Sequence, residues 1–202
     1  METIESIEKR RSTKKFDPSF VIPENDIKKI LSLAIKSPTA FNIQHWRFVI
    51  VSNQALREQI RSVTWMQPQI TDASLLIILC ANVKAWKSPD KYWKNIDPEI
   101  REGIVEAINT YYEGNDLLQR DEAIRSCGIA AQTIMLAATD LGYESCPMDL
   151  SDFNEVGKLI NLPDDHLIAM FIAIGKGLEP PFPRGGQLDL DEVIIYDKFK
   201  KA

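Results

Sequence analysis

The chain has little of what metal sites, disulfide frameworks and membrane spans require. It contains only two histidines and three scattered cysteines in 202 residues, and no CxxC motif. So few ligands argue against a zinc or di-iron site, and the odd, sparse thiol count indicates a reducing compartment. The longest nearly continuous apolar runs, residues 75–81 and 167–175, fall well short of the ~20 residues of a membrane span. With no signal-peptide pattern visible, we expect a cytoplasmic protein that binds no membrane.

The usual motifs of nucleophilic, nucleotide and metalloprotease chemistry are also missing. There is no GxSxG, GxxxxGK[ST] or HExxH sequence. The GKG at residues 175–177 follows an apolar run, but prolines come next instead of a third glycine and a helix, so we reject a dinucleotide fingerprint. Cys146 lacks an accompanying histidine motif and is interpreted as a buried, inert thiol, and His45 as a local hydrogen-bonding residue. A chain without its own acid–base constellation favours chemistry carried by a cofactor.

The positive charge is concentrated near the start of the chain. Five of the seven residues 9–15 are basic, although the net charge is −5 and the pI near 5.2. A compact cationic cluster on an acidic protein suits one phosphate group, whereas the acidic pI argues against nucleic-acid binding. The alternative for this segment alone is a solvated charge run.

Hydrophobic periodicity predicts alternating helices and buried strands. This pattern indicates a single α+β domain over residues 1–202, a sandwich around a central sheet. Residues 84–118, rich in tryptophan, tyrosine and charge, are expected to be an insertion or lid. We expect helices at residues 2–10, 24–36, 54–63, 99–114, 121–141 and 152–160, and strands at 47–51, 75–81, 167–175 and 193–196. The helix at 121–141 has almost no polar side, which predicts burial all round.

Two further segments could contact a ligand. Residues 37–48 join a helix to a strand and carry two carboxamides, a hydroxyl and two aromatic rings. Such groups suit a polyol or the edge of a uracil-like ring. The alternative is a helix stop with a hydrophobic plug. Residues 142–150 follow the apolar helix and could present main-chain N–H groups.

These segments together resemble the FMN-dependent nitroreductase family. RRSTKKF at residues 10–16 looks like the family's N-terminal R-[RH]-S-x-[RK]-x-F segment, and SPTAFNIQHW at 37–46 resembles its [SA]-P-S-x-x-N-x-Q-P-W segment. Residues 142–150 are similar to the family's G-[LY]-x-[ST]-C-x-[IM]-x-G segment. Residues 172–176 resemble its last core strand, and Arg184 resembles a residue of its basic C-terminal stretch. The four motifs follow in order through nearly the whole chain.

The resemblance implies a fold and an assembly. The family fold is a three-layer α/β/α sandwich with a mostly antiparallel central sheet. The family forms an obligate homodimer in a domain-swapped-like arrangement, with FMN at the subunit interface. A partner would help to bury the apolar helix.

The resemblance also implies the residues of the site. The positions that match cofactor contacts are Arg10, Arg11, Ser12, Lys14, Pro38, Thr39, Ala40, Asn42, Gln44, Pro147, Met148, Asp149, Leu150, Lys176 and Arg184. Pro38 to Asn42 would reach the flavin of the other subunit, and Lys14 would lie near N1/O2. The segment from Pro147 would bring an N–H to N5. Candidate acceptor contacts are Phe41, Tyr111 and Tyr112, with packing inside an interface as the alternative.

The implied activity is an NAD(P)H-dependent FMN oxidoreductase. Hydride from NADH or NADPH would pass by a ping-pong cycle to a nitroaromatic, a quinone or a similar planar acceptor. The alternatives are a specialised reductase of the dehalogenase or ene-reductase type, and a non-catalytic flavin-binding dimer.

Three positions depart from the family pattern. His45 replaces a proline, and Asp149-Leu150 replaces a pair that usually ends in glycine. In residues 65–69, Met66 or Gln67 stands where relatives contact the flavin.

Overall fold

A single four-stranded sheet forms the centre of the molecule. The computed structural model describes residues 2–149 and 152–199. The strands are β1 (Trp46–Ile50), β2 (Leu75–Asn82), β3 (Glu144–Met148) and β4 (His166–Gly175). They lie in the order β1-β2-β4-β3, and each neighbouring pair is antiparallel. β1 and β3 are therefore the edge strands.

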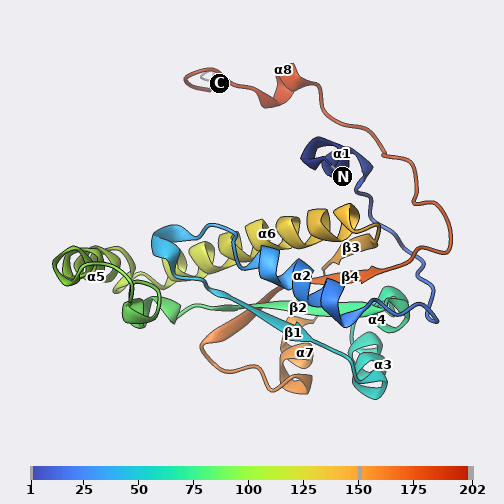
Figure 1. Ribbon diagram of the computed structural model, residues 1–202, viewed down its shortest axis with the longest axis horizontal. Coiled ribbons are helices and arrows are strands. Elements are labelled where there is room, and N and C mark those ends of the chain that lie inside the picture. The colour runs from blue at the N-terminus through green and yellow to red at the C-terminus, as the bar shows by residue number, and fades with distance from the viewer. Residues whose placement is uncertain (1, 150–151, 200–202) are drawn as a thin grey trace.

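Helices cover both faces of this sheet (Figure 1). The helices of the described residues are α1 (Thr3–Lys9), α2 (Glu24–Ala34), η1 (Ala40–Asn42), α3 (Gln54–Ser62), α4 (Gln69–Asp72), η2 (Ala85–Lys87), η3 (Pro89–Lys91), α5 (Pro98–Tyr112), α6 (Asp116–Asp140), α7 (Phe153–Leu159) and α8 (Leu190–Val193). One core cluster joins α2 and α6 to the sheet, and a second joins α3, α4 and α7 to the opposite face. The predicted three-layer α/β/α sandwich with an antiparallel centre is confirmed.

β2 lies between the two cores. Leu75, Ile77 and Leu79 pack in the α2–α6 cluster, whereas Leu76 and Ile78 pack in the opposite one. Successive side chains of a strand point to opposite faces, so a run without polar residues belongs to a strand covered twice. The apolar run at 75–81 therefore forms the buried strand that its composition predicts.

The prediction of a strand at residues 193–196 is wrong. This segment contains the end of α8, whose first turn is closed by a capping box between Asp189 and Glu192. β3 supplies the remaining strand instead. It contains Pro147, which an edge strand tolerates because one side of it has no ladder to complete.

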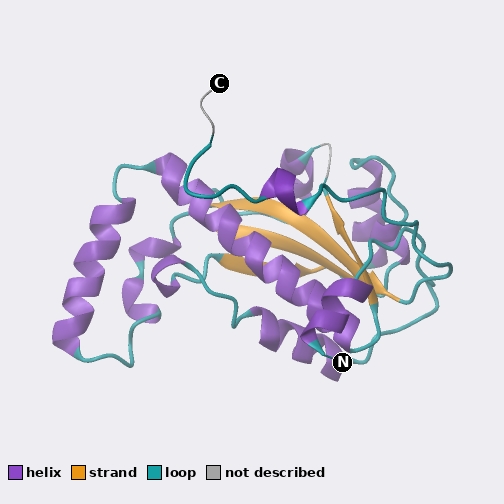
Figure 2. Ribbon diagram, turned by 90° about the horizontal axis from the view of Figure 1, so that it is seen from above, coloured by secondary structure: helices purple, strands orange, loops and turns teal. Residues whose placement is uncertain are grey.

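The long helix α6 is not buried all round within one chain. It crosses the sheet in Figure 2 and packs Cys127, Ala130 and Ile134 into the core. On the side away from the sheet, Gly128 and Gln132 are exposed, and Ile129 is 41% exposed. The helix therefore leaves one side uncovered, and Ile129 is a large apolar side chain exposed on it.

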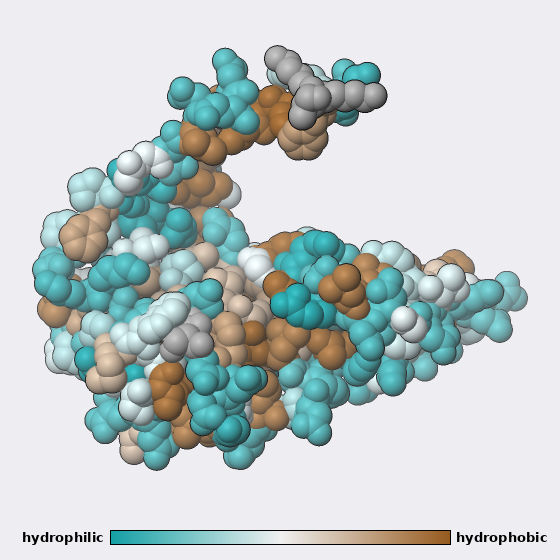
Figure 3. All heavy atoms as spheres, turned by 180° about the vertical axis from the view of Figure 1, so that it is seen from behind, coloured by the Kyte–Doolittle hydropathy of each residue, from teal (hydrophilic) through white to brown (hydrophobic). Residues whose placement is uncertain are grey.

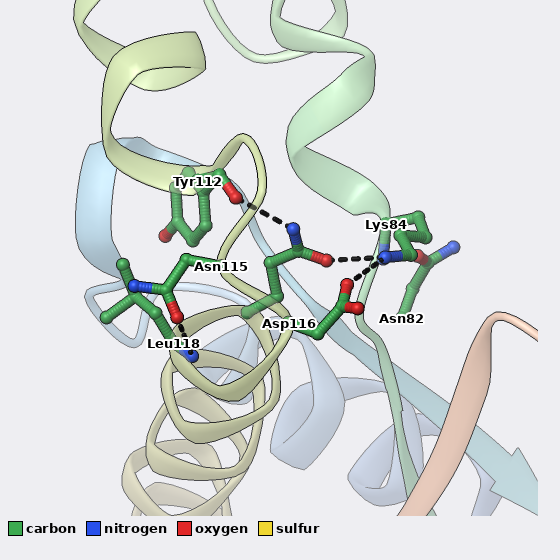
Figure 4. A network of polar contacts seen from close by, with 7 residues as sticks. Asn82, Lys84, Tyr112, Asn115, Asp116 and Leu118 are labelled. Atoms are coloured by element: carbon green, nitrogen blue, oxygen red, sulfur yellow. Dashed lines mark hydrogen bonds and ion pairs between the residues drawn. The ribbon is translucent and has the colours of Figure 1, made fainter.

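The expected insertion forms a projection at one end of the sheet. Its helix α5 stands beyond the strands (Figure 2), while Trp86, Ile108 and Tyr112 fill a third core cluster. Lys84 Nζ donates to Asp116 at 2.8 Å and to Gln119 at 2.6 Å, at the start of α6 (Figure 4). Gln119 in turn donates to the main-chain oxygen of Tyr112 at 2.7 Å. The base of the projection is thus tied to α6.

After β4 the chain leaves the body as an extended stretch. We call residues 185–199 the C-terminal arm. Its exposed large apolar side chains are Leu188, Leu190, Val193, Ile194, Ile195, Tyr196 and Phe199. Figure 3 shows an open gap between the arm and the rest of the molecule. Within residues 2–149 and 152–199, no helix is both long enough and apolar enough to cross a membrane.

Candidate functional site

The basic segment is fixed along the free edge of β3. The main-chain N–H of Thr13 donates to the oxygen of Ser145 at 3.0 Å, and Ser12 forms a bridge with Ser145. Further along, Phe16 is buried and pairs with Gly177 beyond β4. These contacts hold the residues between α1 and Phe16 in one place on the sheet.

Four cationic side chains surround a small pocket beside this edge. The pocket measures about 210 Å³, and no carboxylate of the described residues lines it. We call it the cationic pocket. Its lining residues are Arg10, Arg11, Ser12, Lys14, Phe182, Pro183 and Arg184. The structure thus brings the predicted N-terminal contacts together with Arg184.

Main-chain oxygens hold part of this pocket in place. Arg184 Nη2 donates to the oxygens of Glu8 and Arg10, both at 3.2 Å, and the Arg11 guanidinium donates to the oxygen of Phe182. Arg10 Nη1, however, is buried and has no hydrogen-bond partner among the described residues. The unpaired donor leaves Arg10 able to bind an acceptor, and the four cationic side chains of the pocket favour an anionic one. The pocket therefore fits a phosphate.

The end of β3 lies beside the cationic pocket. Lys14 Nζ is 3.6 Å from the sulfur of Cys146. The side chain of Met148 is buried in the core and Asp149 is exposed, so at Met148 only the main chain can meet a ligand. Pro147 has no N–H to offer. Leu150 lies outside the described residues.

Gln67 joins the α3–α4 turn to this region. Its amide nitrogen donates to the main-chain oxygen of Asp149 at 3.0 Å. Neighbouring Met66 and Trp65 are exposed, and Met66 has a left-handed φ of 51°. The sequence alone does not decide between Met66 and Gln67, because Gln67 and Asp149 are 82 positions apart and no local pattern predicts their contact.

The turn containing Pro38, Thr39, Ala40, Asn42 and Gln44 lies elsewhere on the chain. It closes on itself: Gln44 N–H donates to Thr39 Oγ1 at 3.0 Å, and the Gln44 amide donates to Asn42 at 3.3 Å. None of its residues lines the cationic pocket. The structure does not bring these two predicted sets together in a single chain.

Lys176 also lies apart from the cationic pocket. It is exposed at the end of β4, and its main-chain oxygen accepts the N–H of Asp17 at 2.8 Å. Its predicted cofactor contact therefore has no support in the pocket geometry.

The three predicted acceptor contacts divide into two environments. Tyr112 is fully buried and stacks on Trp86 at 5.9 Å between ring centroids, so its ring packs the third cluster and does not reach the surface. Burial is the main cause that raises the pKa of Tyr112. Phe41 and Tyr111 lie 5.4 Å apart and reach an open groove of about 680 Å³. The groove is lined by Phe41, Gly103, Glu106, Ala107, Thr110, Tyr111, Asn115 and Leu118.

His45, one of the departures from the family motif, is completely buried. Its Nδ1 is 3.0 Å from the main-chain oxygen of Asn82, and Nε2 has no partner among the described residues. Burial lowers the pKa of His45, which keeps the ring neutral. The residue supports the start of β1 from within the core.

Comparisons with known proteins agree with this architecture. The model of the "Nitroreductase family" matches residues 7–176. Protein DrgA of Synechocystis is 47% identical over 180 residues, which cover 89% of this chain and 86% of DrgA. YodC of Bacillus subtilis, provisionally named an NAD(P)H nitroreductase, is 26% identical over 200 residues, covering 96% of this chain and 98% of YodC.

A solved structure shows the same fold. It is a Staphylococcus epidermidis protein provisionally named an NAD(P)H:FMN oxidoreductase, with a TM-score of 0.91 and 22% identity. The match covers 96% of this chain and 95% of that one. The family model spans most of the chain and the DrgA match is close, so the prediction of a nitroreductase-like enzyme is confirmed. This chain belongs to the nitroreductase family.

Proposed function

We propose that this protein is an FMN-dependent oxidoreductase that takes hydride from NADH or NADPH and reduces flat, oxidised acceptors such as nitroaromatics and quinones. The cationic pocket is the observation that carries the proposal, because Arg10, Arg11, Lys14 and Arg184 all line it. The names of YodC and of the Staphylococcus epidermidis protein support the choice of NAD(P)H and FMN.

The residues of the pocket fit FMN. Arg10, Arg11 and Arg184 would bind its phosphate, because guanidinium groups match phosphate oxygens in geometry and charge. Ser12 would bind the ribityl chain, and Lys14 would place positive charge near N1/O2. The main chain at Met148 and Asp149 would offer an N–H near N5. The bound flavin would supply the redox chemistry, with both substrates using its open face in turn.

A second copy of the chain would complete the site. The turn at Pro38 to Gln44 and the cationic pocket are separate within one chain, so we propose a homodimer in which each chain supplies the turn to its partner. The apolar C-terminal arm, together with exposed Ile129 on α6, supplies surface for this contact. Apolar surface of this kind is typical of a subunit interface.

The groove between Phe41 and α5 would receive the acceptor. The tilted rings of Phe41 and Tyr111 line the groove. Gly103 and Ala107 precede Tyr111 at four-residue spacing along the same side of α5, where their small size leaves room. Glu106 also lines the groove. This carboxylate favours neutral or cationic acceptors over anionic ones. The projection at residues 84–118 would act as a lid over the site.

The test is the colour of the purified protein. We expect a yellow protein that releases its flavin on denaturation, and whose flavin absorbance bleaches under anaerobic conditions when NADH or NADPH is added. Acceptors are then scored by the rate at which they restore the absorbance. A bound flavin that neither nucleotide bleaches would indicate a flavin-binding protein without reductase activity. A chain that takes up no FMN would overturn the proposal.

A further inference from the structure

The thiol of Cys146 lies between a lysine and a carbonyl group. Lys14 Nζ donates to its sulfur at 3.6 Å, and the sulfur lies 3.5 Å from the main-chain oxygen of Pro147. If the S–H points to Pro147, the lone pairs of the sulfur face the ammonium group. Cys146 is fully buried, whereas Lys14 is exposed.

Gln69 supplies a second observation at the same place. It is only 4% exposed, and its Oε1 has no hydrogen-bond partner among the described residues. Burial raises the pKa of Cys146, while Lys14, Gln69 and Arg10 act in the opposite direction. Cys146 therefore stays a neutral thiol at physiological pH. Its chemistry is that of a hydrogen-bond acceptor and not of a nucleophile.

We propose that Cys146 is a positioning residue that holds the Lys14 ammonium group beside the FMN site. The inference rests on the proposed function for the identity of the ligand, but the contact itself lies within the chain. The main-chain bonds between Thr13 and Ser145 set the register that brings the two side chains together.

Positioning matters because lysine has a long, flexible side chain. Free in solvent, the ammonium group would sample many rotamers, and only some would place charge near the flavin. A charge that is already in place stabilises negative charge without reorganisation. Fixing Lys14 should therefore favour binding of the reduced, anionic cofactor over the oxidised form.

The experiment compares Cys146→Ala with Cys146→Ser and with a matched control. Cys127→Ala removes the same atoms from an equally buried cysteine, whose sulfur contacts the main-chain oxygen of Cys80 at 3.6 Å. Two quantities are measured. The first is the ratio of the dissociation constants for reduced and oxidised FMN. The second is the rate at which an amine-reactive reagent labels Lys14 in flavin-free protein, followed by mass spectrometry.

In Cys146→Ala we expect the ratio to shift about three- to tenfold against reduced FMN, the size of one lost hydrogen bond of ordinary strength. Lys14 should also be labelled faster. Cys146→Ser should recover part of both effects, because a hydroxyl oxygen still accepts a hydrogen bond. Cys127→Ala should change neither. The shift should vanish when Cys146→Ala is made in a Lys14→Ala background.

If Cys146→Ala leaves both the ratio and the labelling rate at the values of Cys127→Ala, the positioning role is wrong. A flavin-free protein that binds no FMN would overturn the proposed function instead. The labelling rate would then still decide whether Cys146 restrains Lys14.

Discussion

The guanidinium of Arg184 lies 3.2 Å from the main-chain oxygen of Arg10, although 174 residues separate them in the chain. This bond joins the C-terminal stretch to the end of α1. The same guanidinium also lines the cationic pocket that it braces. One pocket is therefore built from both ends of the polypeptide.

Replacing Arg10 should weaken cofactor retention without unfolding the protein. Arg10→Ala removes the buried Nη1 that lacks a partner, and we expect FMN affinity to fall roughly tenfold or more. Flavin occupancy after gel filtration measures the effect. Arg120→Ala is the control, because it removes one arginine from an exposed pair with Asp121. Equal occupancy in Arg10→Ala and the unchanged protein would contradict the phosphate role.

Shortening the C-terminal arm should weaken the dimer. Ending the chain at Gly186 removes every large apolar side chain of the C-terminal arm but keeps Arg184. We expect light scattering to report a lower average mass at micromolar concentration, with an unchanged far-ultraviolet spectrum. In the full chain, the double variant Leu190→Asn with Ile194→Asn should also lower the average mass. The control variant Asp191→Asn should leave the mass unchanged. A truncated chain with the mass of the intact one would exclude the arm from the interface.

Charge reversal in the acceptor groove should change substrate preference. In Glu106→Lys we expect kcat/KM for a sulfonated quinone, relative to its neutral parent, to rise about three- to tenfold at low salt. Glu102→Lys makes the same change of charge on α5 but outside the groove. The rise should shrink in high salt, since screening weakens exposed charges. Identical ratios for the two variants would place the acceptor elsewhere.

The stability that His45 provides should depend on pH. Burial lowers the pKa of His45 in the folded protein, whereas the pKa of a histidine in an unfolded chain is about 6.5. The unfolded chain therefore binds the proton more readily than the folded chain. The stability that neutral His45 contributes is complete above the pKa of the unfolded histidine and declines as the pH falls below that pKa. We expect His45→Asn to be less stable at pH 7.5, with a smaller difference in melting temperature at pH 5. A difference that stays constant or grows would contradict a neutral buried ring.

Local patterns predicted the central architecture but not every element. The unbroken apolar run of β2 indicated cover on both faces, and both cores confirm it. β3 was missed because it is short and contains Pro147. Residues 193–196 combine β-branched and aromatic side chains, but they have no neighbouring strand to pair with. The capping box at Asp189 was the signal for a helix there.

The site could be predicted only in part for a related reason. The cations at residues 9–15 were visible as a cluster, and Arg184 was assigned to it by resemblance. The contacts from Lys14 to Cys146 and from Gln67 to Asp149 depend on how distant segments meet at β3. The periodicity of a local segment does not predict contacts between residues that are far apart in the sequence.

The turn after Pro38 has a consequence for how relatives of this enzyme can diverge. Phe41, Asn42 and Gln44 all have left-handed φ values between 51° and 55°, each costing of order 1 kcal/mol for a residue other than glycine. Trp93 Nε1 offsets part of this cost by donating to the oxygen of Phe41 at 2.9 Å, and Asn42 donates to the oxygen of Tyr92 at 3.4 Å. The conformation of the turn therefore depends on contacts with the projection. A relative in which the projection is rebuilt is expected to carry compensating changes in the turn.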